Sequence, residues 1–291
     1  MRLATNWHDY ELIDAGGGER LERWGDVVLV RPDPQVIWQT PRENPLWERY
    51  DARYVRSSSG GGSWDIRKKL PESWRIKYND LIFHIKPMGF KHTGLFPEQA
   101  VNWDMMRDLI TASGRSIRVL NLFAYTGGAT LACLAAGARV CHVDASKGMT
   151  AWARENAADS GLPFDLQRWI VEDCGRFVAR EARRGNVYDG IIMDPPSYGR
   201  GPSGEVWQLE EQIHGLIEGA AALLSDNPLF FVVNSYSTGL SPSVMKYIMS
   251  VALREKWPGA AISADEIGLP VTSTDLALPC GATSVALNAE L

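Results

Sequence analysis

The stretch Asn121–Thr130, NLFAYTGGAT, constrains the fold of this 291-residue chain more than any other. It lies between an apolar strand pattern at Arg118–Phe123 and a small-residue helix pattern at Ala129–Gly137. A strand that ends in a glycine turn and opens into a helix is typical of an open α/β sheet, where the helix N-terminus lines a crevice for anions and nucleosides. The stretch therefore predicts a nucleoside-binding crevice at the carboxyl end of this strand.

The glycine spacing in the turn narrows the kind of nucleoside. A dinucleotide fingerprint has three spaced glycines, G-x-G-x-x-G. The turn here, AYTGG at Ala124–Gly128, has only two adjacent glycines. Pyrophosphate needs backbone amides packed closely along several positions, so it fits this turn poorly. The methionine tail of S-adenosylmethionine (SAM) needs only a close approach, and we therefore expect SAM rather than a nicotinamide dinucleotide.

The two parts of the chain have different patterns. Residues 1–100 contain short strand-like runs separated by glycine and proline turns, with a hairpin expected at Asn79–Asp80, and this predicts a β-rich N-terminal module. In residues 101–291, apolar strand patterns alternate with helix patterns, which predicts an α/β domain with a mostly parallel sheet and helices on both faces. The predicted strands of that domain are Arg118–Phe123, Arg139–Val143, Phe164–Ile170, Gly190–Met193, Leu229–Val233 and Ser284–Leu287. The predicted helices between them are Met149–Ser160, Cys174–Arg184, Val206–Leu224 and Ser241–Lys256.

The composition indicates the class of protein and the cellular compartment in which we expect it. Hydrophobic residues make up 45% and charged residues 22%, which is typical of a globular protein. No apolar run is long enough for a membrane span, and the N-terminus has no signal core, so we expect a cytoplasmic protein without a membrane partner. The four cysteines contain no C-x-x-C pair, and buried thiols are expected rather than a metal site or disulfides.

The net charge of −5 does not suggest a strongly basic nucleic-acid surface, but the charge is unevenly distributed. Arg53–Lys91 holds nine Lys or Arg and three Asp or Glu, with Trp64, Trp74 and Tyr78 interleaved. Basic and aromatic residues together suit phosphate contacts and base stacking. An ordinary solvated face of a β-rich module has the same composition, so both interpretations stay open.

Three acidic positions follow strand patterns of the α/β domain. Asp144 lies 17 residues after Gly127 and ends a strand pattern, where a carboxylate can accept hydrogen bonds from both ribose hydroxyls. The adjoining Ala145-Ser146 opens the next helix, so Asp144 could also cap it, and both roles can hold at once. Asp173, followed by Cys174, comes after the next strand pattern and could receive the adenine amine, with a neighbouring backbone amide reaching the ring. It too could be a helix cap.

The third acidic position carries the chemistry. Asp194-Pro195-Pro196-Ser197-Tyr198 follows the apolar run Gly190–Met193. The two prolines end the strand and keep the next backbone extended, which leaves the Asp194 carboxylate and the Pro195 carbonyl as paired acceptors for an amine. Tyr198 could stack on a planar base. The glycine-rich stretch 198–204 reads as a mobile loop over the substrate.

Together these motifs resemble class I SAM-dependent methyltransferases, whose domain is a Rossmann-like, mostly parallel seven-stranded sheet. The run Lys91-His92-Thr93-Gly94-Leu95-Phe96-Pro97-Glu98-Gln99 resembles the K-T-G-[FY]-[FY]-x-D-Q signature of the bacterial 23S ribosomal RNA methyltransferase I-like family. The resemblance covers roughly residues 80–290. It implies SAM as cofactor, ribosomal RNA as partner, and cofactor binding by two groups of residues. These are Lys91, Phe96 and Gln99, and then Phe123, Ala124, Tyr125, Thr126, Gly127, Asp144, Ala145, Ser146, Asp173, Cys174 and Asp194.

Two departures limit what the resemblance implies. Cytosine-C5 members carry a T-C-S-C-S run, but the matching stretch Val232–Thr238 has no cysteine, and C5 methylation needs a thiolate to attack C6. Cys280 is a poor substitute, since a thiol near a turn is more often structural. The first 80 residues are also too few for the family's PUA domain plus its linking β unit.

We therefore predict methyl transfer to a base nitrogen, with Asp194, Pro195 and Tyr198 as catalytic residues and ribosomal RNA as the expected substrate. A methyltransferase acting on a protein or small-molecule amine is the alternative, and a non-catalytic RNA-binding module is an alternative of another class. The sequence leaves the oligomeric state open, with a homodimer as one option.

Overall fold

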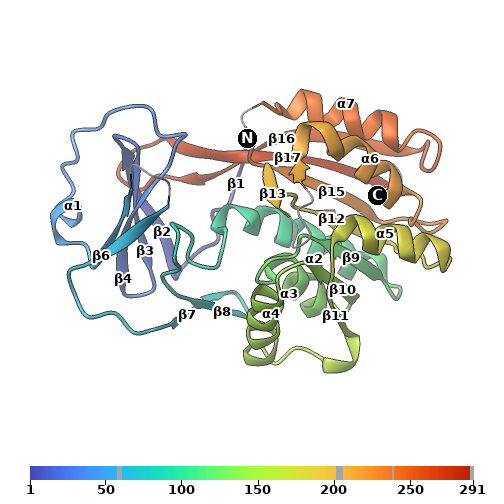
Figure 1. Ribbon diagram of the computed structural model, residues 1–291, viewed down its shortest axis with the longest axis horizontal. Helices are drawn as coiled ribbons and strands as arrows, with labels where there is room; N and C mark the ends of the chain where they lie inside the picture. Colours follow the sequence, from blue (N-terminus) through green and yellow to red (C-terminus); the bar gives the residue numbers. More distant parts are fainter. Residues whose placement is uncertain (58–60, 201–205, 238, 289–291) are drawn as a thin grey trace. The chain divides into compact units, whose positions relative to one another are not determined.

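The computed structural model describes residues 1–57, 61–200, 206–237 and 239–288 (Figure 1). The chain forms two compact units. The first unit comprises Met1–Val101 and Gly268–Cys280, and the second comprises Asn102–Ile267 and Gly281–Leu291. Gly268–Cys280 contains the turn between two long C-terminal strands, so the C-terminal sequence contributes to both units. The division into domains at residues 1–100 and 101–291 stays a prediction.

A mostly parallel sheet forms the centre of the second unit, as predicted. Its strand order is β16-β17-β15-β12-β9-β10-β11. The short β1 (Arg2–Leu3) belongs to the first unit. The strands from β15 to β11 pair in parallel, and β17 pairs antiparallel with β15. Their bounds are β9 (Arg118–Leu122), β10 (Arg139–Asp144), β11 (Gln167–Val171), β12 (Gly190–Met193), β15 (Phe230–Ser235), β16 (Ala260–Pro270) and β17 (Ala277–Asn288).

The strand order places the topological switch point of the sheet between β9 and β12. From β9 the chain proceeds outward through β10 and β11, then returns to the other side of β9 as β12. At such a switch point the loops after the two neighbouring strands diverge, and ligands bind at the carboxyl ends of the strands. The loops in question begin at Phe123 and Asp194, the two motifs that the sequence singled out.

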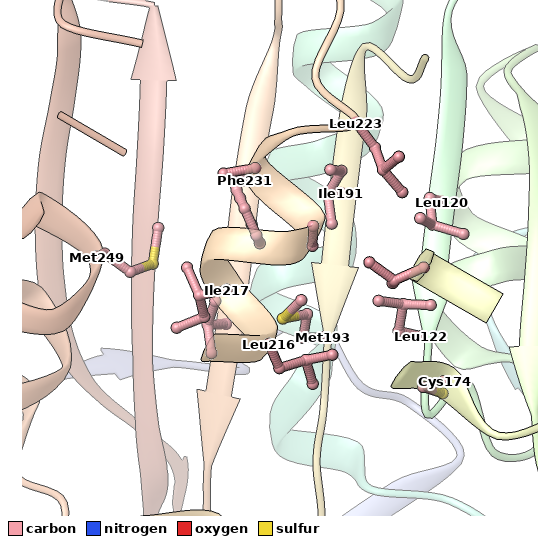
Figure 2. Close-up of a cluster of buried hydrophobic side chains, with 14 of the residues drawn as sticks. Leu120, Leu122, Cys174, Ile191, Met193, Leu216, Ile217, Leu223, Phe231 and Met249 are labelled. Atoms are coloured by element: carbon pink, nitrogen blue, oxygen red, sulfur yellow. The ribbon is translucent and has the colours of Figure 1, made fainter. Parts of the chain in front are cut away.

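One face of the sheet carries the large apolar core of the second unit. Near-continuous apolar strands alternate their side chains between the two faces. Figure 2 shows side chains of β9, β12 and β15 beside Leu216 and Ile217 of α6 and Met249 of α7. Helices α5 (Cys174–Arg183), α6 (Leu209–Ala221) and α7 (Pro242–Ala252) contribute to this core.

The opposite face is covered by α2 (Ala100–Ser113), α3 (Gly128–Ala135) and α4 (Lys147–Asp159). Asn121 in β9 alternates with the core residues Leu120 and Leu122, and its side chain donates to the Thr130 hydroxyl of α3 at 2.9 Å. Asn102 of α2 donates in the same way to Asn234 of β15 at 3.2 Å. Polar side chains therefore join the helices to this face of the sheet.

Several element boundaries differ from the predicted ones. The segment Phe164–Leu166, predicted as strand, is a 3₁₀ turn (η2) that leads into β11. The predicted helix from Val206 begins instead at Leu209, because Val206–Gln208 is a strand (β14) paired with β13 (Tyr198–Arg200). Helix α2 and strand β16 were not predicted.

The first unit is β-rich, as predicted (Figure 1). Its five-stranded sheet has the order β2-β3-β4-β5-β6, with β4 and β5 parallel, and β7–β8 forms a separate hairpin. Asn79, with φ of 53°, makes the tight turn of that hairpin, and its predicted position is confirmed. The bounds are β2 (Tyr10–Gly16), β3 (Glu19–Trp24), β4 (Val27–Pro32), α1 (Leu46–Arg49), β5 (Ala52–Arg56), β6 (Gly62–Ile66), β7 (Trp74–Tyr78), β8 (Leu81–Ile85) and η1 (Pro97–Gln99).

All four cysteines are buried and outside disulfides, as predicted. Within the described ranges, no helix is both long and apolar enough to cross a membrane.

Candidate SAM-binding and catalytic site

The turn after β9 has an unusual backbone. Phe123, Tyr125 and Gly127 have positive φ angles of 54°, 51° and 90°. Left-handed conformations are uncommon for aromatic residues and mark functional turns when the surroundings enforce them. The two glycines of the turn are needed for different reasons. Gly127 takes the left-handed conformation, whereas a Cβ on Gly128 would lie 2.5 Å from the Trp103 ring. Gly128 is therefore required for packing, not for approach of a ligand.

Asp144 ends β10 beside this turn. Its Oδ2 accepts the Tyr125 N–H and its Oδ1 accepts the Ser146 N–H, each at 2.8 Å. Burial raises the pKa of Asp144 above its ordinary value, and the two hydrogen bonds oppose that shift. The helix-cap interpretation of Asp144 is wrong, because the Ser146 side chain caps α4 by accepting the Met149 N–H. Each carboxylate oxygen keeps one lone pair, which leaves capacity for two ribose hydroxyls.

Asp173 and Cys174 open α5. Asp173 is exposed, and its Oδ1 caps the helix by accepting the Arg176 N–H at 2.9 Å, so its helix-cap interpretation is confirmed. The buried Cys174 thiol accepts the Phe123 N–H at 3.3 Å, and burial raises its pKa. The thiol thus supports the turn after β9 and is held in its neutral form. Roles of Asp173 and of the Cys174 backbone amide toward adenine stay predictions.

Asp194 follows β12 directly and lies beside the end of β9, since its N–H donates to the Leu122 carbonyl at 3.3 Å. Pro195 is buried and Tyr198 is 53% exposed. The predicted loop 198–204 begins as a strand: Tyr198 pairs with Gln208 in the β13–β14 hairpin. The remainder of that loop, 201–204, lies outside the described residues.

A pocket of about 880 Å³ lies between α5, α6 and the loops after β9, β10 and β11. Three residues of the predicted cofactor set line it: Phe123, Ala145 and Asp173. Trp207 of β14 also lines it, with its ring 5.5 Å from that of Phe123 and its Nε1 donating to the Pro196 carbonyl at 2.6 Å. Sequence reasoning missed Trp207, because its position depends on a strand hidden within a predicted helix.

The stretch Val232–Thr238, which corresponds to the cysteine run of the cytosine-C5 members, contains buried residues that stabilise the fold. Asn234 is buried, and its Oδ1 accepts the Thr283 hydroxyl at 2.7 Å and the Asn102 amide at 3.2 Å. Ser235 is also buried, whereas Thr238 lies outside the described residues. The run has no thiol in its sequence, and the choice of nitrogen over C5 stays a prediction.

The predicted residues Lys91, Phe96 and Gln99 belong to the first unit, together with Cys280. Gln99 is buried, and the Phe96 ring lies 5.3 Å from that of His92. The expectation that these three residues line the SAM site stays a prediction. Cys280 is buried, and its pKa is raised by burial and by Glu98, which favours a structural thiol over a nucleophile.

The geometry of the second unit fits SAM better than a dinucleotide. Asp144 keeps acceptor capacity for a ribose, and the pocket beside Asp173 has room for a base between Phe123 and the helices. The turn does not offer a series of glycines that pyrophosphate could approach closely. Gly128 packs against the Trp103 ring instead.

Comparison with known proteins agrees with this geometry. The SAM-dependent methyltransferase of Agrobacterium tumefaciens is 35% identical, with a TM-score of 0.93 over 99% of this chain and 93% of that one. The ribosomal RNA large subunit methyltransferase K/L of Magnetococcus marinus is 30% identical over 76% of this chain and 29% of its own length. That of Shewanella frigidimarina is 31% identical over 50% of this chain and 20% of its own length.

This chain thus spans less than a third of the length of these curated relatives. A family model for S-adenosylmethionine-dependent methyltransferases matches residues 49–218, which is more than half of the chain. The chain belongs to the family of S-adenosylmethionine-dependent methyltransferases.

Proposed function

We propose that this methyltransferase transfers the SAM methyl group to a nitrogen of a base in ribosomal RNA. The observation that carries the proposal is the position of Asp194 and Pro195 at the switch point, where the end of β12 meets the end of β9. The names of the K/L relatives support ribosomal RNA as the substrate class. The absence of cysteine from Val232–Thr238 favours nitrogen over cytosine C5.

The chemistry asks little of the protein beyond positioning. Bound SAM supplies a methyl group already activated on a sulfonium. Asp194 and the Pro195 carbonyl accept hydrogen bonds from the target amine and aim its lone pair. The Asp194 carboxylate also stabilises the positive charge that develops on nitrogen. A base within a duplex must first leave the stack, and stacking on the exposed Tyr198 ring offsets part of that cost.

The cofactor roles follow from the same geometry. Asp144 accepts the ribose hydroxyls with the lone pairs that Tyr125 and Ser146 leave unused. Asp173 and the pocket lined by Phe123 and Trp207 receive adenine. The remaining predicted contacts use the turn after β9, the start of α4 and α5, and the signature segment of the first unit. They are Ala124, Thr126, Gly127, Ala145, Cys174, Phe96 and Gln99.

Substitution of Asp194 tests the catalytic assignment. Asp194→Ala is expected to abolish methyl transfer while leaving SAM affinity, measured by calorimetry, nearly intact. Asp165→Ala is the matched control, because Asp165 is exposed in the η2 turn away from the crevice. Turnover of Asp194→Ala equal to that of the control would remove Asp194 from the mechanism.

The same Asp194 arrangement serves an amine on a protein or small molecule equally well. Incubation of the enzyme with labelled SAM and separate RNA, protein and metabolite fractions distinguishes these substrates. Label in the RNA fraction alone supports the proposal, and label in another fraction identifies the alternative. Tight RNA binding without SAM binding would instead indicate a non-catalytic RNA-binding module.

A further inference from the structure

The basic stretch Arg53–Lys91 of the first unit is only partly neutralised. Arg53 pairs with Glu19 at 2.8 Å, and Lys68 pairs with Asp51 at 2.7 Å. Arg56, at the end of β5, is exposed and has no ion pair among the described residues. The structure therefore shows which of these basic side chains are already paired, and Arg56 is one that is not.

The aromatic residues of this stretch also fall into two groups: some are used within the fold, and one is exposed. Tyr78 is 1% exposed, and the half-buried Trp74 donates its Nε1–H to the Trp24 carbonyl at 2.9 Å. Trp64 is also half-buried and donates to the Met88 carbonyl at 2.8 Å. These three rings, which the sequence suggested for base stacking, serve the fold of the unit. Phe90 is instead 47% exposed.

The backbone around Phe90 is fixed from both sides. On one side the Trp64 bond holds Met88, and the Tyr54 hydroxyl donates to the Gly89 carbonyl at 3.5 Å. On the other side Arg31 donates to the Lys91 carbonyl at 3.1 Å. An exposed aromatic ring on a fixed backbone loses little entropy when a planar group stacks on it.

Lys91, the residue after Phe90, adds a cation with few hydrogen-bond partners. It is half-buried, and its ammonium donates to the Pro32 carbonyl at 3.5 Å. Burial, aided by the nearby Arg20, Arg31 and Arg56 and opposed by Asp33, lowers the pKa of Lys91 to about 8. Arg20 and Arg31 have carboxylate partners in Asp33 and Glu22. Among the cations around Lys91, the charge that an incoming anion can still neutralise is therefore on Lys91 itself and on Arg56.

We infer that Phe90, Lys91 and Arg56 form a contact for single-stranded RNA, in which a base stacks on Phe90 and the adjoining phosphate binds Lys91 and Arg56. A stacking ring beside unneutralised cations matches the alternation of base and phosphate along a single strand. The alternative partner, a flat acidic protein surface, would pair with the cations but would have no planar group to stack on the ring. The inference rests on the proposed function, because it assigns the RNA substrate a contact in the first unit.

The test measures RNA binding by full-length variants over a range of salt concentrations. The probes are a mixed-sequence single-stranded RNA of about 15 nucleotides, long enough to span one such contact, and deproteinised ribosomal RNA. Phe90→Leu removes the stack but no charge, and is expected to weaken binding at least about fivefold with an unchanged salt slope. Arg56→Gln removes one phosphate contact, and is expected to reduce the slope of log K against log salt by about 0.7.

Arg49→Gln is the matched control, because Arg49 is also exposed and has no ion pair in the described part of the chain. It is expected to change neither affinity nor slope, and all three variants should bind SAM as the original protein does. If the original protein binds and methylates RNA but Phe90→Leu and Arg56→Gln behave like Arg49→Gln, the inference fails and the proposed function stands. If the original protein neither binds nor methylates RNA, both fail.

Discussion

The Asp144 carboxylate holds the N–H of Tyr125 with one oxygen and the N–H of Ser146 with the other, each at 2.8 Å. Tyr125 belongs to the turn after β9, and Ser146 caps the helix after β10. One side chain therefore joins the two loops on one side of the switch point. It holds Tyr125 in its left-handed conformation, and its remaining lone pairs are the acceptors that we propose for the ribose.

Asp144→Asn is expected to lower SAM affinity by about 10- to 100-fold, because hydrogen bonds to a charged group contribute about 1.5–3 kcal/mol. The amide keeps the size of the side chain but accepts with only one oxygen. Calorimetric titration with SAM measures the effect, and Asp165→Asn, in the exposed η2 turn, is the control. An affinity equal to that of the control would exclude Asp144 from ribose binding.

Gly128→Ala is expected to lower the free energy of unfolding by about 1–3 kcal/mol, since the new Cβ would overpack against Trp103. Gly148→Ala is the matched control in α4: a Cβ there meets only the Ser146 hydroxyl, at 3.9 Å. This change should leave stability equal or raise it by up to about 1 kcal/mol through helix propensity. Urea unfolding of both variants distinguishes them. Equal stability would mean that Trp103 can move aside.

Trp207→Ala is expected to weaken SAM binding about two- to tenfold, the range that one aromatic contact contributes. Trp207→Phe keeps a ring beside Phe123 but loses the bond to the Pro196 carbonyl, and should lose less affinity. Fluorescence or calorimetric titration measures both. If the two variants lose equal affinity, the hydrogen bond to Pro196 matters more than the contact of the ring with Phe123.

The sequence predicted the elements whose signals are local. The strand runs before Phe123 and Asp194 are continuous and apolar, so the sheet and its switch point could be placed without a structure. Trp207 could not be placed, because Val206–Gln208 reads as the start of a helix and becomes a strand only by pairing with Tyr198–Arg200. The sequence also did not show why residue 128 must be glycine, because that depends on its packing against Trp103, in a helix that was not predicted.

The pH dependence of RNA binding is expected to follow Lys91. Its pKa of about 8 means that the side chain is charged at lower pH and loses its charge as the pH rises through this value. RNA affinity should therefore fall between about pH 7 and pH 9, measured without SAM at fixed ionic strength. Lys91→Arg keeps the charge throughout, because arginine does not deprotonate in this range. A fall of equal size in Lys91→Arg would assign the effect to another group.

The most direct test of the proposed function is the fate of the methyl group. Ribosomal RNA from cells lacking this protein is incubated with the purified enzyme and methyl-labelled SAM, and then digested to nucleosides for chromatography and mass spectrometry. We predict label in an N-methylated nucleoside, and its absence when the Asp194→Ala variant replaces the enzyme. Label on carbon, or label confined to protein or small-molecule fractions, would contradict the proposal.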